Sequence, residues 1–208
     1  MNDLASIGPP EVLAALGASF RLHEHPDVIS PLEVCAALGV PLKRTVKTLA
    51  FVTSEDRLLL AALPGHARLR YGALARAAGI RRNDLSPADA GRLARAGMQP
   101  GGVCPVSADR AAVVVFDETI SSLGRVHCGS GRPDRSIEID AAELVVRHDT
   151  RPGPDGAGRA QVSRVRPCRA VTRLASSRPG VPAHGHRSVG VASAAVPTGR
   201  LWLCCREE

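Results

Sequence analysis

Two neighbouring apolar stretches, VKTLAFVT at residues 46–53 and RLLLAAL at residues 57–63, decide the fold class of this chain. Only three polar residues, Ser54, Glu55 and Asp56, separate them. Two strand-like runs joined by such a short polar segment are typical of a β-hairpin. The second run has no polar residue after its first position, which is the pattern of a strand buried on both faces. We therefore expect a hairpin with a largely buried second strand.

Helices and one strand are predicted before this hairpin. A helix is expected over residues 11–16, ended by Gly17, and a strand over residues 19–23. Ser30 begins the clearest helix, because a serine can accept a hydrogen bond from the first turn and Glu33 follows three residues later. That helix ends at the next glycine.

After the hairpin, helices and strands follow one another irregularly. The apolar runs and their breakers predict helices over residues 69–78, 86–96 and 140–146, and strands over residues 111–116, 124–128 and 137–139. The pair Ser86-Pro87 repeats the serine–proline start and is expected to open the second of these helices. There is no regular βαβ alternation, so the sequence favours an α+β domain over a doubly wound sheet.

The net charge of +7 is unevenly distributed. Residues 1–150 hold 17 basic and 17 acidic side chains, whereas residues 151–208 hold ten arginines and three acidic residues. The body of the chain is therefore neutral, and its charge is a poor argument that it binds RNA. Aromatic residues make up only 2% of the chain. The core must then be aliphatic, and platforms for base stacking are scarce.

The composition changes after about residue 150. Residues 151–208 carry six prolines and seven glycines and lack Lys, Ile, Asn, Phe and Tyr. Such a segment cannot bury enough apolar surface to offset its ordering entropy. We expect one folded domain at residues 1–150 and a disordered basic tail at residues 151–208. Two alternatives stay open for the tail: an out-of-frame translation of GC-rich DNA, and an RNA-binding arm.

The sequence shows no secretory signal and no stretch that would span a membrane. The six cysteines lack paired metal spacings, so they are expected to be reduced thiols in a cytoplasmic protein. His23 and His25 would share one face of a strand but have no further ligands nearby. No metal and no membrane partner are expected.

Three segments carry a family resemblance. In order, residues 46–49 hold a strand lysine, residues 97–105 a Gly-Gly-x-x-Pro loop, and residues 128–139 a glycine-rich turn that leads into a strand. This combination resembles the YbaK/prolyl-tRNA-editing family, which is similar to the editing insertion of prolyl-tRNA synthetase. The resemblance covers about residues 10–147. It implies a mixed, barrel-like β-sheet flanked by helices.

The resemblance also implies an activity, the hydrolysis in trans of the ester bond of a mischarged tRNA. The expected substrate carries a small amino acid, and tRNA for proline is the expected carrier. Three positions depart from the family pattern: Cys104 replaces a common serine, Ser136 an acidic residue of some members, and His66 the usual Asp. These departures concern the choice of amino acid more than the reaction.

The glycine-rich loop suits this chemistry. An aminoacyl ester is already activated, so the protein must place a water and stabilise the developing oxyanion. Backbone N–H groups approach a ligand closely where no Cβ intervenes. We expect Gly101 and Gly102 to be catalytic donors, and Val103, Cys104 and Pro105 to line the substrate site. The alternative is an ordinary connection from a helix to a strand.

Lys47 is one of only two lysines in the chain. An ammonium group suits a phosphate or the terminal ribose of a tRNA. The resemblance implies that this lysine belongs to the editing pocket, so we expect Lys47 to position the substrate. The alternative is a solvated lysine at a strand edge. His25 at the pocket rim, and Gly129 and Ser130 in a turn that either binds phosphate or is only tight, complete the predicted substrate-binding residues.

The expected partner is the acceptor end of a tRNA, with an aminoacyl-tRNA synthetase as a second candidate. No cofactor and no DNA partner are expected. Two other functions stay open: a non-catalytic module that binds an aminoacyl-tRNA or a nucleotide, and a cysteine hydrolase. The hydrolase would use Cys104 as nucleophile with His127 or His25 as base. The resemblance instead implies that the substrate's own 2′-hydroxyl helps to activate water.

Overall fold

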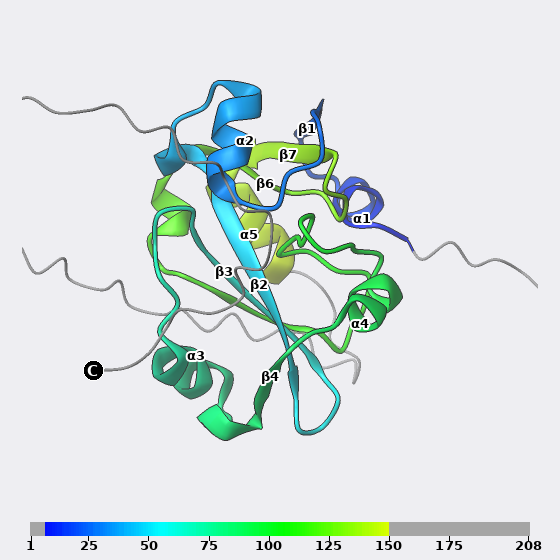
Figure 1. The fold of residues 1–208 in the computed structure, drawn as a ribbon, viewed down its shortest axis with the longest axis vertical. Coiled ribbons are helices and arrows are strands. Elements are labelled where there is room, and N and C mark those ends of the chain that lie inside the picture. The colour runs from blue at the N-terminus through cyan, green and yellow to red at the C-terminus, as the bar shows by residue number, and fades with distance from the viewer. Residues whose placement is uncertain (1–6, 150–208) are drawn as a thin grey trace, which may run out of the picture. The chain divides into compact units, whose positions relative to one another are not determined.

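A computed structural model describes residues 7–149 of the chain, and within this range helices and strands are mixed, without regular alternation, in an α+β domain (Figure 1). The strands are β1 (Phe20–Glu24), β2 (Val46–Thr53), β3 (Leu58–Pro64), β4 (Leu85–Pro87), β5 (Val113–Phe116), β6 (Arg125–Gly129) and β7 (Arg135–Asp140). The α-helices are α1 (Pro9–Ala15), α2 (Pro31–Leu38), α3 (Tyr71–Ala78), α4 (Ala90–Arg95) and α5 (Ala141–Asp149). Three short 3-10 helices are η1 (Leu42–Arg44), η2 (Arg82–Asp84) and η3 (Ile120–Ser122). The α+β prediction is confirmed, whereas the predictions for residues 151–208 lie outside the described residues.

The predicted hairpin forms the centre of a four-stranded sheet with the order β4-β2-β3-β5. β2 and β3 are antiparallel, with Val46 opposite Pro64 and Val52 opposite Leu58. β5 runs parallel to β3 on the other side. Every residue of β3 is buried, which confirms the prediction of a buried second strand.

A second sheet has the order β1-β7-β6, and both of its pairings are antiparallel. Among the described residues one isolated parallel bridge, between Thr45 and His127, joins the two sheets. Beyond it β2 pairs with β4 instead, from Phe51 to Thr53. The strands therefore form two sheets that do not close, and the expected barrel-like sheet is not confirmed.

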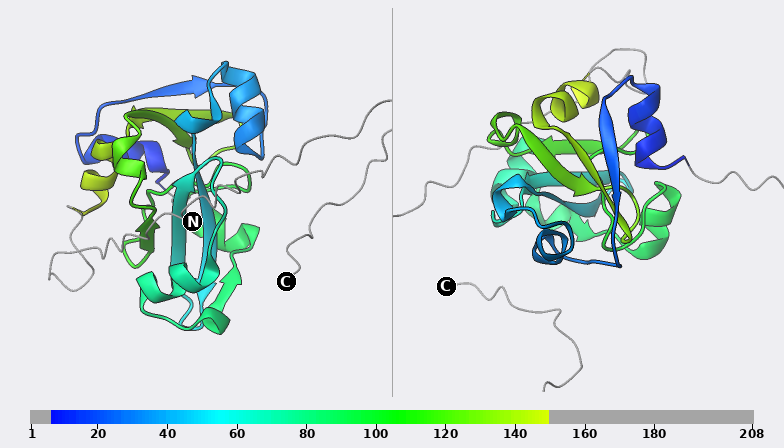
Figure 2. Two further views of the ribbon diagram at one scale, coloured as in Figure 1. Left: turned by 90° about the vertical axis from the view of Figure 1, so that its left-hand side faces the viewer. Right: turned by 90° about the horizontal axis from the view of Figure 1, so that it is seen from above.

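The core lies on both faces of the larger sheet, because successive side chains of a strand point to opposite faces. Leu58 and Leu60 of β3 belong to a cluster that α1 and α5 cover, whereas Leu59 and Leu63 pack beneath α3. Figure 2 shows α1 and α5 together on one side of the three-stranded sheet. Both clusters are mainly aliphatic, as the composition predicts.

Two serine–proline pairs behave differently. At Ser30 the side chain accepts a hydrogen bond from the Glu33 N–H at 3.3 Å, and α2 begins as predicted. The predicted helix start at Ser86 is wrong, because Ser86 pairs with Val52 in the edge strand β4. A proline is tolerated at such an edge, where its missing N–H breaks no ladder. α4 starts later, where the Asp89 carboxylate accepts from the Arg92 N–H at 2.7 Å.

Among the helices of the described residues, none has the length and apolar character that crossing a membrane requires.

Candidate active site

The glycine-rich loop at residues 97–105 is bound to the turn that follows β6. The Gln99 N–H donates to the Gly131 carbonyl at 2.7 Å, and the Gly131 N–H donates to the Gly102 carbonyl at 2.7 Å. Within the loop, the Gly102 N–H donates to the Gln99 carbonyl at 3.0 Å. Two of the segments that carry the family resemblance thus meet in space.

This contact leaves no room for side chains. A Cβ on Gly102 would lie 2.4 Å from the backbone of Arg132, and one on Gly129 would lie 2.2 Å from the Val103 carbonyl oxygen. Gly101 has φ +86° and a hypothetical Cβ 2.7 Å from the Val28 carbonyl oxygen. Glycine is therefore required at all three positions, by close backbone approach and, at Gly101, also by conformation.

Three amides of the loop have no internal partner in the part of the chain that the structure describes; two of them belong to the exposed Gly101 and the half-buried Val103, and the third to the fully buried Cys104. Among the described residues, the N–H groups of Gly101, Val103 and Cys104 have no hydrogen-bond acceptor. The Gly102 N–H is already used within the loop, whereas the N–H of Gly101, the other predicted donor, is not. Neighbouring N–H groups without internal partners can stabilise an anionic oxygen. Pro105 follows them and is buried.

Lys47 lies in β2 with its side chain half-buried. Its Nζ donates to the Gly65 carbonyl at 3.1 Å. Burial lowers the pKa of the Lys47 ammonium, and the nearby positive charge of Arg68 lowers it further. Since desolvation strengthens electrostatic interactions, a positive charge here can bind an anionic group firmly.

The bridge between the sheets brings Lys47 towards the loop. From Thr45 and His127 the two strands run in the same direction, so Lys47 and Gly129 each lie two residues beyond the bridge. Gly129 in turn lies against Val103. β2 meets β4 only from Phe51 onwards. Between these two contacts, residues 46–49 form ladder pairs with β3 alone among the described strands.

Thr48, in this part of β2, is a candidate site residue that the sequence analysis did not identify. It is 8% exposed, and its Oγ1 has no hydrogen-bond partner among the described residues. A buried hydroxyl without a partner is costly. The missing partner of the Thr48 hydroxyl depends on how the strands pair, so no sequence signal could have indicated it.

We expect Thr48→Val to raise Tm and to lower the activity proposed below. Removing an unpaired buried hydroxyl should stabilise the fold by about 1 kcal/mol, which differential scanning calorimetry would detect. Thr53→Val is the control, because the Thr53 Oγ1 accepts from the N–H groups of Glu55 at 3.3 Å and Arg57 at 3.2 Å. That variant should lose stability. A fall of Tm in Thr48→Val would contradict the assignment.

The structure gives His25 and Ser130 internal partners. The two ring nitrogens of His25 contact the Pro26 carbonyl at 2.9 Å and the Ser136 hydroxyl at 2.8 Å. The Ser130 hydroxyl is buried and donates to the Arg135 carbonyl at 2.8 Å. Both side chains therefore hold the three-stranded sheet and its turn, and this engagement favours a tight turn over a phosphate-binding one. Their substrate contacts stay predictions.

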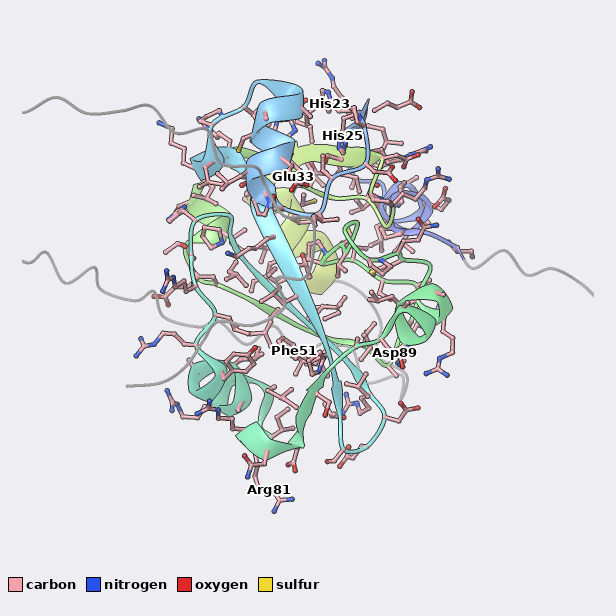
Figure 3. All side chains as sticks on the ribbon, in the orientation of Figure 1. His23, His25, Glu33, Phe51, Arg81 and Asp89 are labelled. Atoms are coloured by element: carbon pink, nitrogen blue, oxygen red, sulfur yellow. The ribbon has the colours of Figure 1, made fainter. Side chains whose placement is uncertain are left out.

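The two histidines at the end of β1, His23 within the strand and His25 just after it, make pairwise contacts. Figure 3 labels His23 and His25 near this strand, and the His23 Nε2 lies 2.8 Å from the Glu138 Oε2. The part of the chain that the structure describes contains no group of three His, Cys, Asp or Glu residues that could hold a metal.

Cys104 is poorly placed to be a nucleophile. It is 0% exposed. Burial raises the pKa of its thiol well above the usual range, and the hydrogen-bonded Cys128 thiol raises it further. The nucleophilic form of cysteine is the thiolate, which this environment disfavours. His25, one of the two suggested bases, is engaged with Ser136 instead.

We expect Cys104→Ala to keep most of the activity proposed below, with kcat/KM within about threefold of wild type and a modest loss of stability from the lost packing. Steady-state kinetics at 25 °C would measure this. Alkylation of the native protein followed by peptide mass spectrometry should modify the partly exposed Cys35 before Cys104. Complete loss of turnover in a folded Cys104→Ala protein would instead support the hypothesis of a cysteine hydrolase.

Comparison with known proteins identifies the family. The family model of the aminoacyl-tRNA editing domain matches residues 25–146. This match spans more than half of the chain, so the protein belongs to the aminoacyl-tRNA editing domain family.

Its relatives include much longer proteins. Proline–tRNA ligase of Thiobacillus denitrificans is 28% identical over 168 residues, covering 74% of this chain and 28% of the ligase. The ligase of Bordetella petrii is 29% identical over 159 residues, covering 67% of this chain and 27% of the ligase. The protein YwhH of Bacillus subtilis is 27% identical over 112 residues, covering 54% of this chain and 70% of YwhH. The chain spans about a quarter of the length of these ligases.

Solved structures share the fold. The crystal structure of the hypothetical protein APE2540 superposes with a TM-score of 0.58 at 28% identity, covering 66% of this chain and 91% of that one. A candidate trans-editing enzyme for prolyl tRNA synthetase superposes with a TM-score of 0.57 at 24% identity, covering 65% and 86%. At this identity the second likeness establishes the fold alone.

Proposed function

We propose that the protein is an aminoacyl-tRNA deacylase that acts in trans on a small amino acid mischarged to tRNA, with tRNA for proline as the carrier. The observation that carries this proposal is the row of unengaged amides at Gly101, Val103 and Cys104 in a chain of the editing family. The similarity to proline–tRNA ligases supports the choice of tRNA.

The reaction needs little from the protein. A water adds to the ester carbonyl, the carbonyl oxygen becomes an oxyanion, and the bond to the ribose oxygen then breaks. The products are a free amino acid and an intact tRNA 3′ end. In this proposal the loop amides stabilise the oxyanion, and Lys47 holds an anionic or ribose oxygen of the terminal nucleotide. The substrate's 2′-hydroxyl helps to activate the water, so no protein nucleophile is required.

A panel of mischarged tRNAs tests the proposal. The full chain is incubated with alanyl-, cysteinyl- and seryl-tRNA for proline, and release of the amino acid is followed against the uncatalysed rate. Hydrolysis of at least one substrate, with correctly charged prolyl-tRNA spared, is the expected result. If no substrate is hydrolysed faster than the uncatalysed rate, the proposed deacylase function is wrong.

The second candidate function is a module that binds an aminoacyl-tRNA without cleaving it. The engagement of the Gly102 N–H within the loop favours it, because one predicted donor is not available to an oxyanion. Protection of the ester against spontaneous hydrolysis in the same panel would identify such a module.

A further inference from the structure

The strongest concentration of charge in the described domain surrounds α3. Residues 57–83 contain six arginines and no acidic residue, although residues 1–150 as a whole are neutral. We call five of these residues the α3 arginine surface; they are Arg68, Arg70, Arg76, Arg81 and Arg82. All five side chains are exposed. Residues 1–150 therefore have no net charge as a whole but carry a local excess of positive charge around α3.

Three of these arginines are available for a partner. In the part of the chain that the structure describes, the side chains of Arg68, Arg70 and Arg76 form no hydrogen bond or ion pair. By contrast, Arg81 pairs with Asp84 at 3.1 Å. Figure 3 shows nitrogen-tipped side chains around α3, with Arg81 labelled at one end.

An exposed aromatic ring lies within the same surface. Tyr71 is 42% exposed, and its ring meets Phe51 edge-on with centroids 5.7 Å apart. The Arg82 guanidinium lies 5.8 Å from the Tyr71 ring centroid. A ring fixed in this way beside guanidinium groups is typical of surfaces that bind nucleic acid.

The surface is continuous with the candidate site. The Lys47 Nζ donates to the Gly65 carbonyl at 3.1 Å, and Arg68 follows Gly65 by three residues, near enough for its charge to lower the pKa of that ammonium. Figure 1 shows the chain descending from the end of β3 to α3 along one side of the domain, and in sequence Arg68 belongs to this connection. A polyanion that enters the site at Lys47 would therefore continue onto the arginines.

We propose that the α3 arginine surface binds the phosphate backbone of the tRNA acceptor stem. Guanidinium groups bind phosphate oxygens in pairs of parallel hydrogen bonds, and the three exposed arginines without internal partners are available for such bonds. This inference rests on the proposed function, because it assigns a binding surface to the part of the same tRNA substrate that lies beyond the reacting ester.

The test compares two triple variants of the full chain with the same change in charge. Arg68→Gln/Arg70→Gln/Arg76→Gln removes the unpaired arginines of the surface. Arg57→Gln/Arg95→Gln/Arg110→Gln removes three exposed arginines elsewhere. The ten arginines of residues 151–208 are the same in all proteins, so their contribution is common to each measurement. The probe is a non-aminoacylated RNA hairpin with an acceptor-stem duplex and a single-stranded 3′ end. Its binding is measured by titration at several salt concentrations.

The surface variant is expected to bind about 10- to 100-fold more weakly than wild type, and its salt slope should fall by roughly three. The control variant should bind nearly as wild type does. Equal losses in both variants, or none in the surface variant, would overturn the proposal. Because the probe carries no ester, a protein without deacylase activity can still give the expected result. The two proposals therefore fail separately.

Discussion

Replacement of Lys47 by methionine is expected to lower kcat/KM for deacylation by on the order of 100-fold or more, while the domain stays folded. Methionine keeps most of the apolar stem and removes only the charge and its hydrogen bond to the Gly65 carbonyl. The ammonium lies in a partly desolvated position, where burial lowers its pKa. The measurement is the initial rate on the best substrate of the mischarged panel.

Lys43→Met is the matched control, because Lys43 is the other lysine of the chain and is exposed in η1. Its activity should stay within about twofold of wild type, as surface substitutions generally do. Equal losses in the two variants would show that overall charge, and not the position of Lys47, supports the reaction. Full activity of Lys47→Met would remove this residue from the site.

Gly102→Ala is expected to destabilise the domain by about 2–4 kcal/mol and to abolish deacylation. The added Cβ would lie 2.4 Å from the Arg132 backbone, which cannot rotate away as a side chain can. The loop would have to move, and the amides of its neighbours would move with it. Urea unfolding followed by circular dichroism measures the first effect, and the tRNA assay measures the second.

Gly72→Ala is the control for this substitution. Gly72 lies in α3, and its hypothetical Cβ would be no closer than 3.8 Å to another atom, the end of the Arg76 side chain. Alanine in a helix is expected to raise stability by about 0.5–1 kcal/mol. If the Gly102→Ala protein is as stable as wild type, the loop can shift away from the Arg132 backbone at little cost and is not held by the turn.

The elements that depend on local sequence were predictable. The hairpin at residues 46–63 is observed, and Gly39 ends α2 with φ 65°, as an αL residue after a helix should. Ser86 shows the limit of this reasoning. Its pattern matches that at Ser30, but the neighbouring edge of β2 pairs with it and overrides the local preference.

The site was predictable in outline and not in its atoms. The order of the lysine, the loop and the turn indicated that they belong together, and the loop and turn do meet. Which amide stays unengaged could not be read from the sequence, because the acceptor of the Gly102 N–H and the donor to its carbonyl are set by folding. Thr48 and the α3 arginines were missed for the same reason, since partners and exposure depend on the whole fold.

The close packing of the loop on the turn has a consequence for the order of folding. The Gly102 carbonyl receives its hydrogen bond from Gly131, and Gly101 lies against Val28, about 70 residues earlier. Contacts between such distant residues form late in folding. Closing the long intervening loop costs chain entropy before the contact contributes any stabilisation. The amide row therefore exists only once β6 and β7 have docked. Recovery of activity during refolding should then report completion of the domain rather than formation of its hairpin.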